Sequence, residues 1–184
     1  MNFDSYIAHF EDVLAHPIPP YDNPDYYNYA KLNWSRMNRW LKHGKLDEEL
    51  KTIISSIEKP LKWLIITEPW CGDAAHVTPF LQLAAALNSN ITVEYELRDQ
   101  EPFQINQYLT NGGKSIPKLI IRDKEGNDLA TWGPRPAACQ LVYAQLTEEK
   151  ADFETVKTAL QKWNNENAGV EIQKELIGLM KELD

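Results

Sequence analysis

The stretch EPWCGDA, residues 68–74, places a cysteine between two segments of different pattern. The residues before it, LKWLIIT at 61–67, are rich in apolar and β-branched side chains and predict a buried strand. The residues 71–88 are rich in alanine and leucine and predict a helix. Cys71 should therefore lie at a helix N-terminus, where unpaired amides carry partial positive charge and favour a thiolate. The alternative is that Cys71 is a small buried apolar residue.

The pattern around this stretch alternates between strands and helices over about residues 60–148. It predicts strands at 61–67, 91–97, 117–123 and 128–132, and helices at 71–88, 103–109 and 134–146. The resulting order, β-α-β-α-β-β-α, predicts an α/β domain in which helices flank a central mixed sheet.

Helical patterns occupy both ends of the chain. Residues 1–59 predict three helices, with a proline-rich loop at 16–25 and a second helix that begins near Asp25, a candidate N-cap. Residues 149–184 predict two amphipathic segments that NNENAG interrupts. We expect both extensions to pack on the domain at 60–148 as one compact unit.

Composition and charge exclude several classes of function. The chain has 19 Lys and Arg against 27 Asp and Glu, a net charge of −8, which argues against nucleic acid and anionic membranes as partners. It has no apolar run of the ~20 residues that span a bilayer, and no Lys or Arg before Lys31, so it lacks the basic start of a signal peptide. A cytoplasmic location with free thiols is therefore the expectation. The four histidines and two cysteines show no metal-ligand spacing, so no metal is expected.

Three short motifs resemble the active site of the thioredoxin family: WCG at 70–72, SIP at 115–117 and TWG at 131–133. In that family the first motif carries the reactive cysteine, the second ends in a cis-proline that faces the sulfur, and the third ends the last strand with a glycine near the site. The resemblance covers about half the chain and implies a thioredoxin-like three-layer sandwich. With helices added at both ends, the pattern is similar to that of a thioredoxin-like subfamily with a WCGDA motif.

The sequence departs from this family at three positions. Ala74 stands where thioredoxins carry a second cysteine, so Cys71 cannot form a disulfide within the motif. Ile65 stands where they bury an aspartate that assists the second thiol. Asp73 replaces the usual proline, and its charge opposes a thiolate that the helix N-terminus favours, so the net shift in the pKa of Cys71 stays open. The site is expected to be monothiol.

The resemblance and the predicted topology imply a set of substrate-binding residues around Cys71: Trp70, Gly72, Asp73, Ile116, Pro117, Gly133 and Arg135. The backbone at Ile116 would pair with substrate in the manner of an added strand. Arg135, together with Lys114 and Arg98, could hold a thiolate or the carboxylate of a glutathione-like thiol, as the resemblance to monothiol glutaredoxins suggests. For each of these cations, a solvated surface charge is the commoner role.

Other features are expected to be structural. Cys139 lies roughly 8 Å along the predicted last helix, beyond the about 7 Å between Cα atoms that a disulfide tolerates, and reads as a core cysteine. His76 is expected to pack or to face solvent rather than to serve Cys71 as a base. The basic stretch 31–45 predicts a solvated face. The aromatic residues of 21–40 predict packing on the core, with the wall of a substrate groove as the alternative.

Two functions from different classes follow. The first is a monothiol redox protein in which Cys71 is the nucleophile of thiol–disulfide exchange or deglutathionylation, on a protein or small-molecule disulfide. It would need no cofactor beyond a low-molecular-weight thiol as reductant. The alternative is a non-catalytic module of the same fold that binds a peptide or protein, so enzymatic activity is left open. A weaker third hypothesis is a peroxide sensor that oxidises Cys71 to a sulfenic acid.

Overall fold

The computed structural model describes residues 1–183 as seven α-helices, one 3₁₀ helix and four strands. No helix in this range is both long and apolar enough to cross a membrane. In chain order the elements are α1 (Phe3–Ala15), α2 (Pro24–His43), α3 (Glu48–Ser55), β1 (Leu61–Thr67), α4 (Gly72–Ala85), β2 (Ile91–Leu97), η1 (Gln104–Gln107), β3 (Lys118–Arg122), β4 (Asp128–Trp132), α5 (Ala137–Glu148), α6 (Phe153–Asn167) and α7 (Val170–Glu182).

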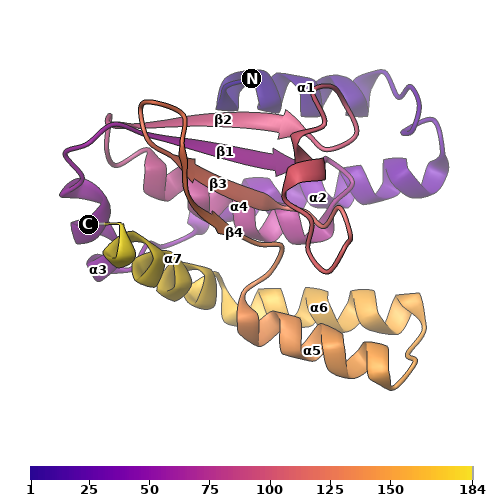
Figure 1. Ribbon diagram of the computed structural model, residues 1–184. Coiled ribbons are helices and arrows are strands. Elements are labelled where there is room, and N and C mark those ends of the chain that lie inside the picture. Colours follow the sequence, from indigo (N-terminus) through magenta and orange to yellow (C-terminus); the bar gives the residue numbers. More distant parts are fainter. Residues whose placement is uncertain (184) are drawn as a thin grey trace.

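The four strands form one mixed sheet in the order β2-β1-β3-β4 (Figure 1). β1 pairs parallel with β2 and antiparallel with β3, and β3 pairs antiparallel with β4. The sheet and its flanking helices confirm the predicted α/β class and the thioredoxin-like fold with added helices. The observed strands agree with the predicted ones to within one residue at each end, because their apolar runs and bounding turns are sharp.

β1 is one of the two inner strands, and both of its faces are covered. Trp63 and Ile65 join the large core that α1, α4 and α7 also enter. Leu64 and Ile66 join a smaller cluster on the opposite face, together with Ile105 of η1. This two-sided burial explains why the strand reads as a nearly continuous apolar run rather than an alternating one.

The helix predicted at 103–109 is wrong in extent. Only a 3₁₀ turn forms, η1, and it is preceded by Phe103 in a left-handed conformation with φ 54°. The segment offers a single buried apolar side chain, Ile105. One apolar contact cannot offset the entropy of nucleating a longer helix, so the segment stays a single turn.

Two helix starts differ from the prediction. Asn23, not Asp25, caps α2: its side chain accepts a hydrogen bond from the Asp25 amide, and Pro24 takes the first helical position. α5 begins only at Ala137, after Pro136. A proline disfavours helical backbone at the residue before it, so the helix predicted from residue 134 cannot begin ahead of Pro136.

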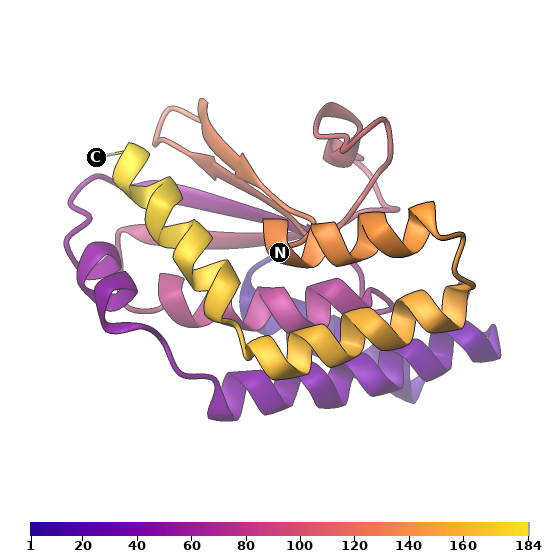
Figure 2. The same ribbon diagram turned by 90° about the horizontal axis from the view of Figure 1, so that it is seen from below.

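Segments from the two ends of the chain lie side by side (Figure 2). α3 contacts α7, and α2 meets α6 through a hydrogen bond of 2.7 Å from Arg39 Nη2 to Asn165 Oδ1. Ala168 and Gly169, both left-handed, separate α6 from α7 within the predicted interruption. A Cβ at Gly169 would lie 2.2 Å from Phe80, so only glycine fits this turn.

α1 covers the outer edge of the sheet. The ring of Tyr6 stacks on that of Tyr95 in β2, with 4.7 Å between the ring centroids. The amine of Met1 donates to the Tyr95 carbonyl at 2.8 Å, and the Tyr95 amide donates to the Met1 carbonyl at 2.7 Å. The start of the chain thus pairs with an edge strand whose polar groups would otherwise be open to another chain.

Candidate functional site

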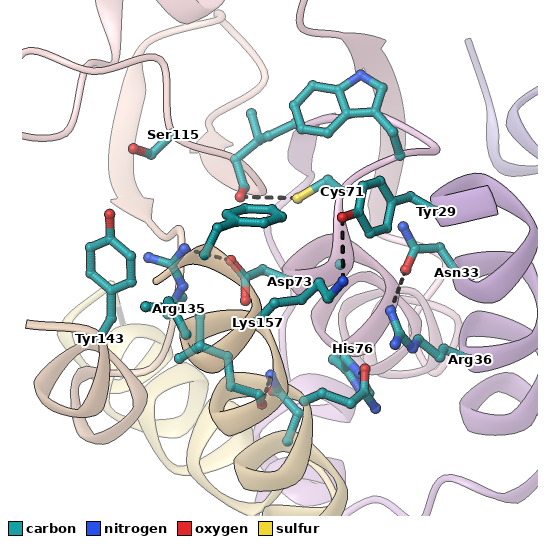
Figure 3. Close-up of a pocket in the computed structure, with 18 of the residues that line it drawn as sticks. Tyr29, Asn33, Arg36, Cys71, Asp73, His76, Ser115, Arg135, Tyr143 and Lys157 are labelled. Atoms are coloured by element: carbon teal, nitrogen blue, oxygen red, sulfur yellow. Dashed lines mark hydrogen bonds and ion pairs between the residues drawn. The ribbon is translucent and has the colours of Figure 1, made fainter. Parts of the chain in front are cut away.

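A cavity of about 1020 Å³ opens beside the start of α4 (Figure 3). Cys71, Asp73 and His76 line it from the start of α4, α2 forms one wall, and α5 and α6 form another. The segments that follow β2 and precede β3 complete the lining. The volume matches the upper end of the roughly 300–1,000 Å³ usual for small-molecule sites.

Cys71 is the N-cap of α4, and it is 7% exposed. Its Sγ accepts a hydrogen bond from the Ala74 amide at 3.5 Å and donates one to the Ile116 carbonyl at 3.4 Å. The peptide bond between Ile116 and Pro117 is cis. The turn between β1 and α4 thus brings the thiol into contact with the loop before β3 (Figure 3).

Burial, followed by the nearby charge of Asp73, raises the pKa of Cys71 to about 12. The Ala74 amide and the charge of Arg135 act in the opposite direction but are weaker. The net direction, which the sequence left open, is therefore upward, because taking the thiolate out of water costs more than the helix N-terminus contributes. At neutral pH the resting residue is a thiol, with its hydrogen directed to the Ile116 carbonyl.

Asp73 and Arg135 form an ion pair of 2.8 Å in which both side chains are mostly buried. Burial raises the pKa of the Asp73 carboxyl, and the guanidinium opposes that rise. Arg135 also donates to Gln140 at 3.1 Å and lies 4.4 Å over the ring of Tyr143. In the resting structure Arg135 is therefore already paired with an internal carboxylate. This leaves Arg135 less available for a ligand carboxylate than the sequence suggested.

Gly133 ends β4 against the loop that holds Pro117. Its φ of +116° is a conformation that favours glycine, and a Cβ would lie 2.2 Å from the Pro117 carbonyl oxygen. Its own carbonyl accepts a hydrogen bond from the buried Lys118 Nζ at 3.0 Å. These contacts hold β4 and the turn into α5 against the cis-proline loop.

Trp70 stands at the rim of the cavity, half-buried. Arg98 lies 4.5 Å over its ring, and Tyr26 of α2 meets it edge-on at 5.9 Å. Arg98 is paired with Asp99 at 2.7 Å, whereas Lys114 is exposed. Arg98 and Lys114 line the cavity as the topology predicted, because the ends of β2 and of the loop before β3 meet there.

Glu68 is a buried acid that the sequence interpretation did not single out. It accepts hydrogen bonds from the Tyr21 hydroxyl at 3.3 Å and from the Asp99 amide at 3.0 Å, and its carbonyl accepts one from the Cys71 amide at 3.0 Å. Burial raises the pKa of its carboxyl to about 7. The available signal was an acid directly after a buried apolar strand.

His76 packs in the protein interior, which is one of the two roles expected for it, the other being exposure to solvent. Its Nδ1 accepts a hydrogen bond from Trp40 Nε1 at 2.9 Å, and its Nε2 lies 3.1 Å from Gln161 Oε1. Burial lowers the pKa of His76 to about 4. Because both ring nitrogens are occupied, the imidazole is not hydrogen-bonded to the Cys71 thiol.

α2 contributes to the site a buried polar residue, Asn33, and a cation, Arg36, that the sequence interpretation assigned to a solvated face. Asn33 is 1% exposed and donates from Nδ2 to the Pro69 carbonyl at 3.0 Å. Arg36 is partly buried in the cavity wall and donates from Nη1 to Asn33 Oδ1 at 2.8 Å. The other basic residues of 31–45 are exposed, as predicted, so the expectation fails at Arg36 alone. Arg36 and Asn33 are three residues apart and so share one face of the helix, and this spacing was the signal in the sequence that could have predicted their contact.

The aromatic residues of 21–40 have both of the roles proposed for them: some pack in the core, and others form a wall of the cavity. Tyr21 is buried in the core, whereas Tyr26 and Tyr29 line the cavity. Phe153, at the start of α6, is 68% exposed and lies across from Tyr29 with 6.5 Å between ring centroids. Lys157 donates to the Tyr29 hydroxyl at 3.3 Å, which joins α6 to α2 over one side of the cavity (Figure 3).

Cys139 is buried within α5 at 1% exposure, and both cysteines are free. Burial, followed by the charge of Asp73, raises the pKa of Cys139 to about 12. The residue does not line the cavity. Residues 1–183 contain no group of three or more His, Cys, Asp or Glu side chains placed to hold a metal ion.

A family model described as thioredoxin matches residues 21–152, well over half of the chain. The chain belongs to the thioredoxin family. Two solved structures resemble this thioredoxin-family protein over nearly its whole length. A protein of unknown function from Pseudomonas aeruginosa shares 17% identity at a TM-score of 0.57, covering 95% of this chain and 92% of its own. An HIV epitope-scaffold shares 16% identity at 0.58, covering 98% and 92%.

At these identities the two structures show the fold alone. No curated protein matches the chain. Family membership and fold therefore indicate a redox or other thioredoxin-fold function, and the chemistry has to be argued from the site itself.

Proposed function

We propose that this protein is a monothiol redox protein in which Cys71 is the nucleophile of thiol–disulfide exchange. The observation that carries the proposal is the placement of Cys71: it lines the cavity, lies at the N-terminus of α4 and contacts Ile116. A substrate can reach the sulfur from the cavity, and the helix amide that faces the sulfur is positioned to stabilise negative charge as it develops there. Ala74, in place of a second cysteine, makes the site monothiol.

The exchange proceeds in two balanced steps. Cys71 loses its proton and attacks one sulfur of a disulfide RS–SR′; the S–S bond breaks, R′S⁻ leaves and takes up the proton, and Cys71 is held as a mixed disulfide with RS. A small thiol R″SH then attacks this mixed disulfide, which yields RS–SR″ and restores the Cys71 thiol. No oxidant or reductant other than these sulfur compounds takes part.

Substrate binding would change the surroundings of the resting thiol. The Ile116 carbonyl accepts the S–H of Cys71 at rest. A substrate backbone N–H that pairs with this carbonyl, in the manner of an added strand, competes for the same acceptor. Under this proposal the substrate contacts the residues predicted from the sequence: Trp70, Gly72, Asp73, Ile116, Pro117, Gly133 and Arg135. Five of them line the cavity with Cys71, whereas Pro117 and Gly133 do not line it.

The raised pKa of Cys71, about 12, favours a second candidate function. A buried thiol that stays protonated is also what a non-catalytic thioredoxin-fold module would contain. In that case the cavity would bind a peptide or a small molecule without covalent chemistry. The reactivity of the sulfur distinguishes the two candidates.

The deciding experiment traps adducts on the protein with a small disulfide such as glutathione disulfide and reads them by intact mass spectrometry. Wild type and Cys139→Ser are expected to gain one mixed disulfide, whereas Cys71→Ser is expected to gain none. The pH profile of Cys71 alkylation is recorded with and without a bound peptide. Absence of any adduct on wild type, with alkylation confined to strongly basic pH, would favour the binding module.

The proposal places the protein in a reducing compartment such as the cytoplasm, where small thiols are abundant. Its partners are a protein or small-molecule disulfide and a low-molecular-weight thiol, with no resident cofactor. Neither nucleic acid nor a membrane enters the proposal, because the chain carries a net charge of −8.

A further inference from the structure

The cavity carries positive charge in an otherwise acidic protein. Two acids line it, Asp25 and Asp73, against five cationic side chains: Arg36, Arg98, Lys114, Arg135 and Lys157. Three of these cations are neutralised by their own neighbours, in the pairs Arg98–Asp99, Arg135–Asp73 and Lys157–Glu154. Arg36 and Lys114 have no acidic partner anywhere in residues 1–183.

Of these two, Arg36 is held in place. Asn33, 1% exposed, is fixed by its bond to the Pro69 carbonyl and accepts one N–H of the guanidinium (Figure 3). A Cβ at Gly72 would lie 3.8 Å from Arg36 Nη1, so the guanidinium sits beside the start of α4. Burial, followed by the nearby charge of Arg39, lowers the pKa of Arg36.

A half-buried guanidinium without an acid is costly unless something else compensates its charge. The hydrogen bond to Asn33 uses only one of the five N–H donors of the Arg36 guanidinium. The N-terminus of α4 adds partial positive charge at the same place. An anion from a ligand would satisfy both, and a carboxylate matches the planar fork of the guanidinium.

We infer that Arg36, oriented by Asn33, recognises a carboxylate of a small thiol compound or of its disulfide. The inference deepens the proposed function and rests on it for the sulfur end: the ligand's carboxylate binds Arg36 while its sulfur faces Cys71. The Tyr29–Lys157 contact closes one side of the cavity, which suits a compact small-molecule ligand, one of the two substrate classes proposed above. Aromatic rings of Tyr29 and Trp70 would pack on the ligand's apolar part.

The test uses an unreactive probe, S-methylglutathione, and its diethyl ester, which lacks both carboxylates but keeps the charged amine, with binding measured by calorimetry. Wild type is expected to prefer the acid. Arg36→Gln should weaken acid binding by about tenfold or more, the size of one lost charge-assisted hydrogen bond, and should not weaken binding of the ester. Arg36→Lys, which keeps the charge but loses the fork, should fall between them. Lys42→Gln is the matched control, since Lys42 is exposed on the same helix and outside the cavity.

Equal acid binding by wild type and Arg36→Gln, or no acid binding by wild type, would overturn the inference. A parallel reaction with glutathione disulfide separates this outcome from failure of the proposed function. Arg36-dependent probe binding without any mixed disulfide at Cys71 would support the inference while the redox function fails. A mixed disulfide that forms at equal rates in wild type and Arg36→Gln, with equal probe binding, would leave the redox function standing and remove the inference.

Discussion

The surroundings of Cys71 and Cys139 are alike in several respects. Both residues are buried and free, and burial and the charge of Asp73 raise both pKa values to about 12. They differ in backbone position and access. Cys71 caps α4 with the Ala74 amide directed at its sulfur and lines the cavity, whereas Cys139 lies inside α5 and does not line that cavity.

Burial and resting pKa therefore do not separate a candidate nucleophile from a structural cysteine in this molecule. What separates them is whether donors point at the sulfur and whether a substrate can reach it. Four substitutions test this comparison, ordered here from the largest expected effect to the smallest.

Gly133→Ala should have the largest effect, because Gly133 joins the loop under Cys71 to the turn that leads into α5. A Cβ there would meet the Pro117 carbonyl at 2.2 Å in a left-handed backbone. We expect a loss of at least ~3 kcal/mol in the free energy of unfolding in urea. Gly178→Ala is the control: its Cβ meets nothing within 4 Å on α7, and stability should rise by up to ~1 kcal/mol. Equal stability of Gly133→Ala and wild type would contradict the close approach.

Glu68→Gln tests a titration that belongs to the Cys71 side alone. Burial raises the pKa of the Glu68 carboxyl from 4.5 to about 7. The folded state therefore holds this proton more tightly than the unfolded state, so the contribution is present below about pH 4.5 and is lost as pH rises through about 7.

Removing this carboxyl should accordingly stabilise the protein above pH 7, by about 1–3 kcal/mol, and flatten its stability between pH 4.5 and 7. Thermal unfolding across that range measures the effect. Glu58→Gln, at an exposed position, should reproduce the wild-type curve. A pH dependence that survives in Glu68→Gln would argue that another group titrates.

Asp73→Asn sharpens the comparison, because Asp73 raises the pKa of both cysteines. Its loss should lower the pKa of Cys71, and so increase the thiolate fraction several-fold at a given pH. Alkylation by iodoacetamide, followed by peptide mass spectrometry, should show this gain at Cys71 and little at Cys139, which the cavity does not reach. Asp25→Asn removes a charge from the same cavity as a control, and a matching gain there would refute a specific effect of Asp73.

Cys139→Ala should have the smallest effect. Removing one buried sulfur leaves a small void and should cost about 1 kcal/mol of unfolding free energy. The rate at which Cys71 forms a mixed disulfide should stay at the wild-type value. A large fall in that rate would reveal a resolving or supporting role for Cys139 and end the distinction between the two thiols.

Much of the fold was predictable from local pattern. The four strands were located to within a residue, since a short apolar run between turn residues has few other uses. A helix start was predictable only approximately even where a side chain caps the helix, since Asn23 rather than Asp25 caps α2. Where prolines dominate, as before α5, pattern placed the start too early. The helix predicted at 103–109 was longer than the observed 3₁₀ turn η1, because helical spacing does not report how little apolar surface a segment can bury.

For the site, the sequence alone determined the position of Cys71 at a strand–helix turn, the absence of a second motif thiol and the presence of a neighbouring acid. Only the tertiary structure decided what these groups meet: Arg135 on Asp73, and Asn33 with Arg36 beside Gly72. Helical periodicity shows which residues share a face, but not which distant surface that face packs against. The rise in the pKa of Cys71 was likewise undecided until burial could be weighed against the helix N-terminus, because desolvation depends on the packing of the whole chain.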